Sequence, residues 1–191
     1  NNQNDASDSE KILEKMEMIS NNVDICNKVV QELYSYTHRS GMRLEKNNLS
    51  VVLEEIKSYA LDKMENYDDI QIETDFEIED ISLKIDLFKI LQAFKNLINN
   101  AFDAIEDEGT ISLFSRKNEH VIQIAIQDDG VGIADNHLEK IYEPFYTSKV
   151  KGFGIGLSVV KEIIDGHNGD LEIKSEAGKG TKALVSLPII T

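Results

Sequence analysis

The sequence predicts an α+β protein, a two-layer α/β sandwich in which helices cover one face of a mixed sheet, preceded by a long amphipathic helix. Apolar and polar residues alternate in short segments between residues 70 and 187, which is typical of strands with one buried face. Residues 91–105 and 155–165 instead carry apolar residues at helical spacing. A longer helical repeat runs through the first forty residues. We therefore expect residues 1–45 to form a helical unit and residues 46–191 to form the sandwich.

Composition limits the classes of function. The chain has 191 residues, 41% of them hydrophobic, and a net charge of -15, and this acid excess argues against contacts to a DNA or RNA backbone. The single cysteine, Cys26, cannot form an internal disulfide, and no apolar run reaches the roughly 20 residues of a membrane span. We expect a cytoplasmic location, no nucleic-acid partner and no membrane contact within these residues.

The N-terminal helix is predicted by a seam of the heptad type. Its apolar residues follow one another at alternating steps of four and three, in the order Ile12, Met16, Ile19, Val23, Cys26, Val30 and Leu33. The alternative is an amphipathic helix that lies on its own domain, but this narrow pattern favours a coiled coil or bundle. We therefore expect a homodimer through this helix. Gly41 marks its end or a hinge.

The elements of the sandwich follow in order. Ser50 is expected to cap a helix that runs to about residue 66, with a buried face of Val52, Leu53, Ile56, Ala60 and Met64. Asp86 is expected to cap a longer helix, and Gly109 to end that helical region. Further helices are expected at residues 137–141 and 155–165. Strands are expected at residues 70–76, 81–84, 110–115, 121–127, 170–175 and 181–187, the last two joined by a Gly-Lys-Gly turn.

The long helix carries two stripes. One is apolar and consists of Leu91, Ile98, Phe102 and Ile105; the other is polar and consists of Asn96, Asn100 and Asp103. Two amides and a carboxylate on one face can contact a ligand together. Taken alone, the pattern fits a surface helix equally well, so its meaning depends on the motifs that follow.

The first such motif is Asp-Asp-Gly-Val-Gly at residues 128–132, directly after an apolar strand. A carboxylate at a strand end can accept a hydrogen bond from an exocyclic amine, and the glycines allow a sharp turn against which a flat ring can lie. An ordinary Asp-Gly turn is the alternative.

A second glycine cluster, Gly-Phe-Gly-Ile-Gly-Leu at residues 152–157, lies where a loop enters a helix. Helix N-termini suit anions, so this cluster indicates a phosphate site, although a lone Gly-x-Gly-x-Gly is weak evidence. Between the clusters, residues 142–149 contain aromatic residues followed by Lys149. This composition fits a lid over phosphates, and an inert surface loop is the alternative. Gly-Lys-Gly-Thr at residues 178–181 fits an ordinary hairpin turn.

Together these motifs resemble a known family. Asn-Leu-Ile-Asn-Asn-Ala, Asp-x-Gly-x-Gly, Glu-Pro-Phe-Tyr-Thr-Ser-Lys, Gly-x-Gly-x-Gly-Leu and Gly-x-Gly-Thr resemble the N, G1, F, G2 and G3 boxes of sensor histidine kinases. All five occur in the family's order across residues 96–181. The wording of the F box is most similar to the branch that contains the nitrogen-regulation kinases. The N-terminal helix looks like the second helix of the family's dimerisation hairpin.

The resemblance implies the GHKL, or Bergerat, ATP-binding fold, with ATP and Mg²⁺ as cofactors and a response regulator receiver domain as partner. It implies that Asn100 ligates the metal, that Asp128 contacts the adenine amine and that the second glycine cluster contacts the phosphates. The residues expected to be catalytic are Asn96, Asn100 and Lys149. Those expected to bind nucleotide are Asn100, Asp103, Asp128, Gly130, Gly132, Ile133, Phe145, Lys149, Gly152, Gly154, Ile155, Gly156, Leu157 and Thr181.

The chain departs from the family in two places. Phe153 stands where a Thr is common, which changes a lid side chain but keeps the glycines. The phosphoacceptor box, a His followed by an acidic residue, is missing: His38 precedes Arg39, so we expect an exposed structural histidine there. His120, His137 and His167 are interpreted as surface or core residues. The acceptor histidine is therefore expected outside this chain.

Three functions are compatible with the motifs. The first is the ATP-binding catalytic domain of a two-component kinase, which transfers the γ-phosphoryl of ATP to a histidine on the dimerisation helix. The second is an ATPase clamp of the same fold, but such relatives place a glutamate as base where this chain has Asn96, and an amide cannot act as a base. The third is a nucleotide-binding interaction module without enzymatic activity. The sequence favours the kinase.

Overall fold

The computed structural model describes residues 15–16, 41–77, 81–147 and 154–190. Lys15 and Met16 are helical, and the rest of the expected N-terminal helix, including His38, lies outside the described residues. The dimerisation seam and the domain boundary near residue 45 therefore stay predictions. No helix in the described ranges is both long and apolar enough to cross a membrane.

The centre of the fold is a five-stranded mixed sheet in the order β2-β4-β5-β7-β6. Its strands are β2 (Ile70–Phe76), β4 (Gly109–Asn118), β5 (Val121–Asp128), β6 (Asp170–Glu176) and β7 (Gly180–Pro188). β2 pairs with β4 in parallel and the other neighbours are antiparallel. The mixed sheet is thus confirmed, with β4 and β5 longer than the alternating segments indicated.

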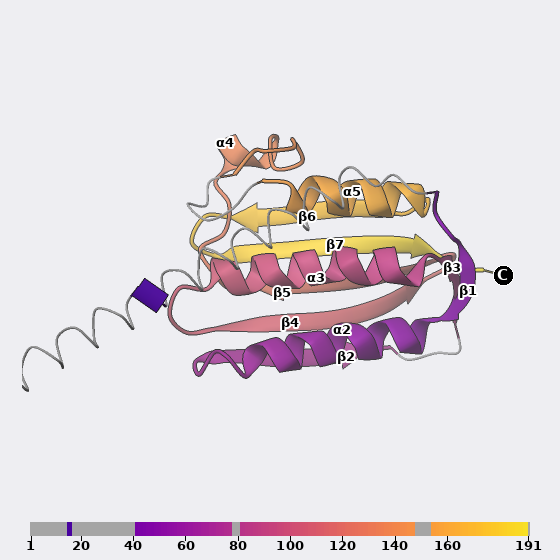
Figure 1. Cartoon of the computed structure of the whole chain (residues 1–191), viewed down its shortest axis with the longest axis horizontal. Coiled ribbons are helices and arrows are strands. Elements are labelled where there is room, and N and C mark those ends of the chain that lie inside the picture. Colours follow the sequence, from indigo (N-terminus) through magenta and orange to yellow (C-terminus); the bar gives the residue numbers. More distant parts are fainter. Residues whose placement is uncertain (1–14, 17–40, 78–80, 148–153, 191) are drawn as a thin grey trace, which may run out of the picture.

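Three helices cover one face of this sheet, as expected: α2 (Leu49–Met64), α3 (Leu87–Ala104) and α5 (Gly156–Gly166). α3 lies between the other two and packs on both of them (Figure 1). Its buried side chains are Ile90, Ala93, Phe94, Leu97, Ile98, Ala101 and Phe102. They meet the apolar inner face of the sheet, which includes Ile111, Leu113, Ile122, Ile124 and Val185.

The helix ends show how the sequence sets the boundaries. Asp86 caps α3 as expected, because its Oδ1 accepts a hydrogen bond from the Lys89 N–H at 3.2 Å. Asn48 caps α2, so the expectation for Ser50 is wrong by two residues: the Ser50 N–H donates to Asn48 Oδ1 at 2.9 Å, and fully buried Leu49 already belongs to the helix. α3 ends at Ala104, and Gly109 begins β4 instead of ending the helical region.

A second, two-stranded sheet closes one end of the sandwich. β1 (Glu45–Asn48) pairs antiparallel with β3 (Ser82–Ile85), which corresponds to the strand expected at residues 81–84. The sequence analysis missed β1, because Glu-Lys-Asn-Asn has no apolar alternation. At the opposite end, α4 (Asp135–Leu138) is shorter and earlier than the helix expected at residues 137–141 (Figure 1).

Candidate functional site

Asp128 lies at the end of β5 with only 6% of its surface exposed. Its Oδ1 accepts hydrogen bonds from two backbone N–H groups, that of Gly130 at 3.1 Å and that of Thr181 at 3.2 Å. The two donors come from the turn after β5 and from the start of β7. Hydrogen bonds from both sides fix the direction of this buried carboxylate, and a carboxylate accepts hydrogen bonds only.

The turn after Asp128 fits closely against its neighbours. A Cβ atom on Gly130 would lie 2.3 Å from the Ala104 carbonyl oxygen at the end of α3, and one on Gly132 would lie 2.1 Å from the Glu176 carbonyl oxygen. Gly132 also has a φ of 66°, which favours glycine. Backbone hydrogen bonds hold Val131 on both sides, from its N–H to the Ala104 carbonyl oxygen at 2.9 Å and from the Gly178 N–H to its carbonyl oxygen at 2.7 Å. The glycines are therefore required by close packing.

The polar stripe of α3 faces the start of α5. The Asn96 Nδ2 donates a hydrogen bond of 3.5 Å to the Gly156 carbonyl oxygen. The structure therefore brings the Asn-Leu-Ile-Asn-Asn-Ala motif and the second glycine cluster together. Asn100 and Asp103 are exposed further along the helix. Asn99 does not belong to this stripe, because its Oδ1 accepts a hydrogen bond of 3.0 Å from the Tyr59 hydroxyl on α2.

The described part of the second glycine cluster packs against the aromatic loop. Gly154 has a φ of 67°, and a Cβ atom on it would lie 2.4 Å from the Tyr146 carbonyl oxygen. Its own carbonyl oxygen accepts a hydrogen bond of 2.9 Å from the N–H of Phe145, whose side chain is 62% exposed and whose φ is 70°. Ile155 is buried and has no side-chain hydrogen bond to the first turn of α5, while Leu157 packs against the core. The first turn of α5 is therefore not capped by the residue before it.

Residues 148–153 lie outside the described ranges, so the expectations for Lys149, Gly152 and Phe153 stay predictions. The histidines are placed as interpreted. His120 is exposed, His167 is buried, and half-buried His137 makes a hydrogen bond through Nδ1 with the Tyr146 hydroxyl. This contact joins α4 to the aromatic loop.

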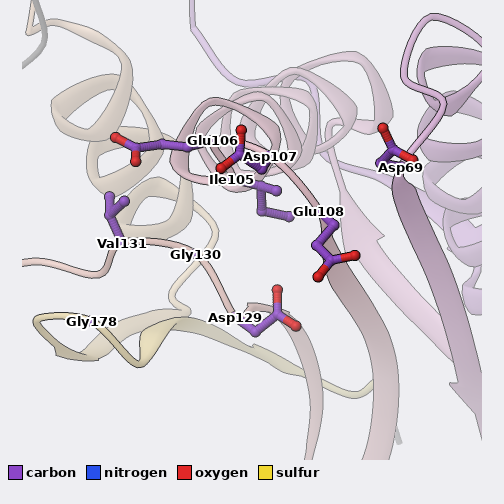
Figure 2. A pocket seen from close by; sticks show the side chains of 9 residues that line it. All are labelled: Asp69, Ile105, Glu106, Asp107, Glu108, Asp129, Gly130, Val131 and Gly178. Atoms are coloured by element: carbon purple, nitrogen blue, oxygen red, sulfur yellow. The ribbon is translucent and has the colours of Figure 1, made fainter.

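A pocket of about 610 Å³ lies beside the turn after β5 (Figure 2). Five of its nine lining residues carry carboxylates: Asp69, Glu106, Asp107, Glu108 and Asp129. Asp129 also holds the start of β4, since its Oδ1 accepts a hydrogen bond of 2.8 Å from the Thr110 N–H. A triphosphate would be repelled by this lining, so the phosphate end of a nucleotide does not belong in this pocket.

The sequence analysis missed Ser175 in β6. Its Oγ accepts a hydrogen bond of 2.8 Å from the Ile133 N–H, and it also contacts the start of β7. A serine within an alternating strand carries no special signal, so only the tertiary arrangement identifies it. Thr181, by contrast, was expected in the site and does lie beside Asp128.

Comparisons with known proteins show relatives of this chain. Residues 85–191 match the family described as histidine kinase-, DNA gyrase B-, and HSP90-like ATPase. Sporulation kinase A of Bacillus subtilis (strain 168) is 36% identical over 141 residues, which are 74% of this chain and 23% of that protein. The chain therefore spans less than a quarter of the length of this relative.

Two solved structures are also similar. The catalytic domain of histidine kinase ThkA, in a nucleotide-free form, aligns with a TM-score of 0.66 and 28% identity, covering 77% of this chain and 96% of that one. Histidine kinase ThkA in complex with response regulator protein TrrA aligns with a TM-score of 0.73 over 91% of this chain and 50% of that one, at 24% identity, and this likeness shows the fold alone. The chain belongs to the family of histidine kinase-, DNA gyrase B- and HSP90-like ATPases, as an ATP-binding catalytic domain of the sensor histidine kinase kind.

Proposed function

We propose that this chain binds ATP with Mg²⁺ and transfers the γ-phosphoryl group to a histidine of a dimerisation helix, for relay to a response regulator. The observation that carries the proposal is the environment of Asp128. It is a buried, acceptor-only carboxylate, fixed by two N–H donors next to a glycine turn. The 6-amino group of adenine is a matching donor.

The other motifs supply the remaining contacts of the proposed site. The first turn of α5 offers backbone N–H groups and a positive dipole end to the phosphates, and Gly154 and Gly156 keep side chains out of this approach. Asn96 holds this turn against α3. Lys149 and Gly152 are proposed to complete the phosphate contacts.

The residues present fit Mg²⁺ that is shared with the nucleotide. Within the described ranges, no group of three or more His, Cys, Asp or Glu side chains is placed to hold a metal ion by itself. Mg²⁺ commonly binds through one or two protein ligands together with substrate phosphates, and the exposed amide of Asn100 on α3 suits that arrangement. When bound, the ion would neutralise charge on the phosphates.

In the proposed transfer, the lone pair of an imidazole nitrogen forms a bond to the γ-phosphorus. The bond from that phosphorus to the bridging oxygen breaks, and its electrons leave with ADP. Such transfer depends on positioning and charge neutralisation more than on acid–base groups. Asn96 stands where an ATPase clamp would have its glutamate base, and an amide cannot activate water, so transfer is favoured over hydrolysis.

Partner binding is proposed from two observations. The structure of a related kinase contains a response regulator, and the heptad seam of residues 12–33 suits a homodimer. An interaction module that binds nucleotide without transferring phosphate would share the site described here, and a phosphotransfer assay distinguishes it from a kinase.

Titration calorimetry with ATP and Mg²⁺ tests the nucleotide site. Asp128→Asn turns part of a buried acceptor into a donor facing the amine, which should cost about 1–3 kcal/mol, or roughly tenfold or more in affinity. Asp129→Asn is the matched control, because its carboxylate lines the acidic pocket and binds the Thr110 N–H instead. Equal affinity of Asp128→Asn and the parent would remove the adenine assignment.

A further inference from the structure

The Ser175 hydroxyl connects the two segments that hold Asp128. Its Oγ accepts a hydrogen bond of 2.8 Å from the Ile133 N–H, lies 2.9 Å from the Gly180 carbonyl oxygen and lies 2.9 Å from Thr181 Oγ1. Ile133 follows the glycine turn after β5, while Gly180 and Thr181 begin β7. One half-buried side chain thus has three polar partners in the two segments that supply the N–H donors of Asp128.

The directions of these hydrogen bonds follow from the chemistry of the groups. A serine hydroxyl has one hydrogen to donate and two lone pairs that accept. The Gly180 carbonyl oxygen can only accept, so the Ser175 hydrogen points to it. The Ile133 N–H can only donate, so it takes one lone pair. In the remaining contact Thr181 must therefore be the donor and Ser175 the acceptor.

This direction determines what Thr181 can offer a ligand. Its hydroxyl hydrogen is directed to Ser175, so toward other groups the Thr181 oxygen is an acceptor. The backbone N–H of the same residue donates to Asp128 Oδ1 at 3.2 Å, which places Thr181 beside the carboxylate. The side chains of Asp128 and Thr181 therefore both offer acceptors, and neither offers a donor, to a ligand group that approaches Asp128.

We propose that Ser175 is a positioning residue for the nucleotide site: by fixing the Thr181 hydroxyl as an acceptor, it makes the site select purines with a 6-amino group and reject those with a 6-oxo group. This inference rests on the proposed function. An amino group donates to both acceptors, whereas a carbonyl oxygen would face two acceptors without a hydrogen between them.

Nucleotides that differ only at position 6 of the purine separate this role from general support of the site. Titration calorimetry on the full chain would compare ATP, inosine triphosphate, which carries a 6-oxo group, and purine riboside triphosphate, which carries hydrogen there. Ser175→Ala leaves the Thr181 hydroxyl free to turn. The variant should bind ATP about tenfold more weakly than the parent, while its affinity for purine riboside triphosphate should change by less than about twofold.

Two further variants control the experiment. Ser175→Thr keeps the hydroxyl and should restore the preference for ATP. Ser115→Ala removes a buried serine of β4, away from Asp128. The Ser115 Oγ donates a hydrogen bond of 3.3 Å to the Glu77 carbonyl oxygen, and its loss should leave the preference for ATP unchanged. If circular dichroism shows that Ser175→Ala does not fold, Ser175→Cys keeps the shape and replaces the hydroxyl with a weak donor and acceptor, and it should show the same loss of preference.

The outcomes distinguish this inference from the proposed function. If the unmodified chain fails to bind ATP, both are wrong. If the unmodified chain prefers ATP, and Ser175→Ala lowers the affinity for all three nucleotides equally or for none of them, the role proposed for Ser175 is wrong while the proposed function stands.

Discussion

The backbone N–H of Asp86 donates a hydrogen bond of 2.9 Å to Nε2 of His167. Asp86 precedes α3 and His167 follows α5, so this contact ties together two helices of the proposed site. Nδ1 of His167 donates to the Ile163 carbonyl oxygen at 2.7 Å, which fixes a neutral ring with its hydrogen on Nδ1. Burial lowers the pKa of His167 from its ordinary value, and Lys89 lowers it further while Asp86 and the hydrogen bond to Ile163 oppose the shift.

His167 should make stability depend on pH. Because its pKa is lower in the folded chain than in the unfolded chain, the unfolded chain binds more protons once the pH falls below about 6.5. The free energy of unfolding should therefore be constant above that pH, as far as His167 contributes, and should fall on acidification. Urea denaturation of the parent and of His167→Gln at pH 7.5 and pH 5.5 tests this, since glutamine does not titrate.

At neutral pH, His167→Ala should cost about 1–3 kcal/mol, because it leaves the Asp86 N–H without its acceptor. His120→Ala is the control, since His120 lies exposed between β4 and β5 and its removal should change the free energy of unfolding little. If His167→Gln lost as much stability on acidification as the parent, the dependence would have another source.

Gly132→Ala should destabilise the folded chain. The residue has a φ of 66°, and the added Cβ would lie 2.1 Å from the Glu176 carbonyl oxygen, so the turn must move away from the β6–β7 hairpin. Backbone strain of this kind costs about 1–3 kcal/mol, and we expect nucleotide affinity to fall with it. Gly41→Ala, where a Cβ would have no neighbour within 4 Å, should change the urea midpoint little. Equal midpoints for the two variants would contradict the packing argument.

Asn100→Ala should abolish the Mg²⁺ dependence of ATP binding and nearly all phosphoryl transfer, because it removes the proposed metal ligand. Asn99→Ala offers a matched control on the same helix, since its side chain faces Tyr59 on α2. Calorimetry with and without Mg²⁺ should separate the two. A normal transfer rate in Asn100→Ala would exclude this residue from the metal site.

The chain should bind ATP without labelling itself, because its sequence contains no phosphoacceptor box, and it should label a supplied dimerisation hairpin that carries such a box. Incubation with radiolabelled ATP and a test of acid lability would show which protein carries phosphohistidine. Acid-labile phosphate on His38 would overturn the assignment of that histidine.

The sequence predicted the elements whose pattern is set by burial. β2 occupies residues 70–76, as its alternation indicates, and α3 buries Ile98 and Phe102 of the expected apolar stripe. The sequence failed to predict elements and caps that depend on tertiary contacts. β1 exists because it pairs with β3, and Asn48 caps α2 because Leu49 is needed in the core. Asn48 and Ser50 are both suitable N-cap residues, and only the packing of Leu49 shows which of them begins the helix.

The candidate site shows the same division. Glycine motifs at residues 128–132 and 178–181 are visible in the sequence, because close backbone approach leaves few other choices. Ser175 is not visible, since its importance comes from three partners that folding brings to one oxygen. The acidic pocket draws its residues from separate segments around residues 69, 106, 129 and 178, and no local pattern joins them.

The position of β7 matters while the chain is being synthesised. β7 follows β5 and β6 in sequence but lies between them in the sheet, and in the described part of the chain β6 pairs with β7 alone. A nascent chain that ends before Gly180 therefore has an open edge on β5 and lacks the Thr181 N–H that holds Asp128. Since a ligand stabilises only the state that binds it, cellular ATP should give no protection to the domain on the ribosome until β7 has emerged and paired.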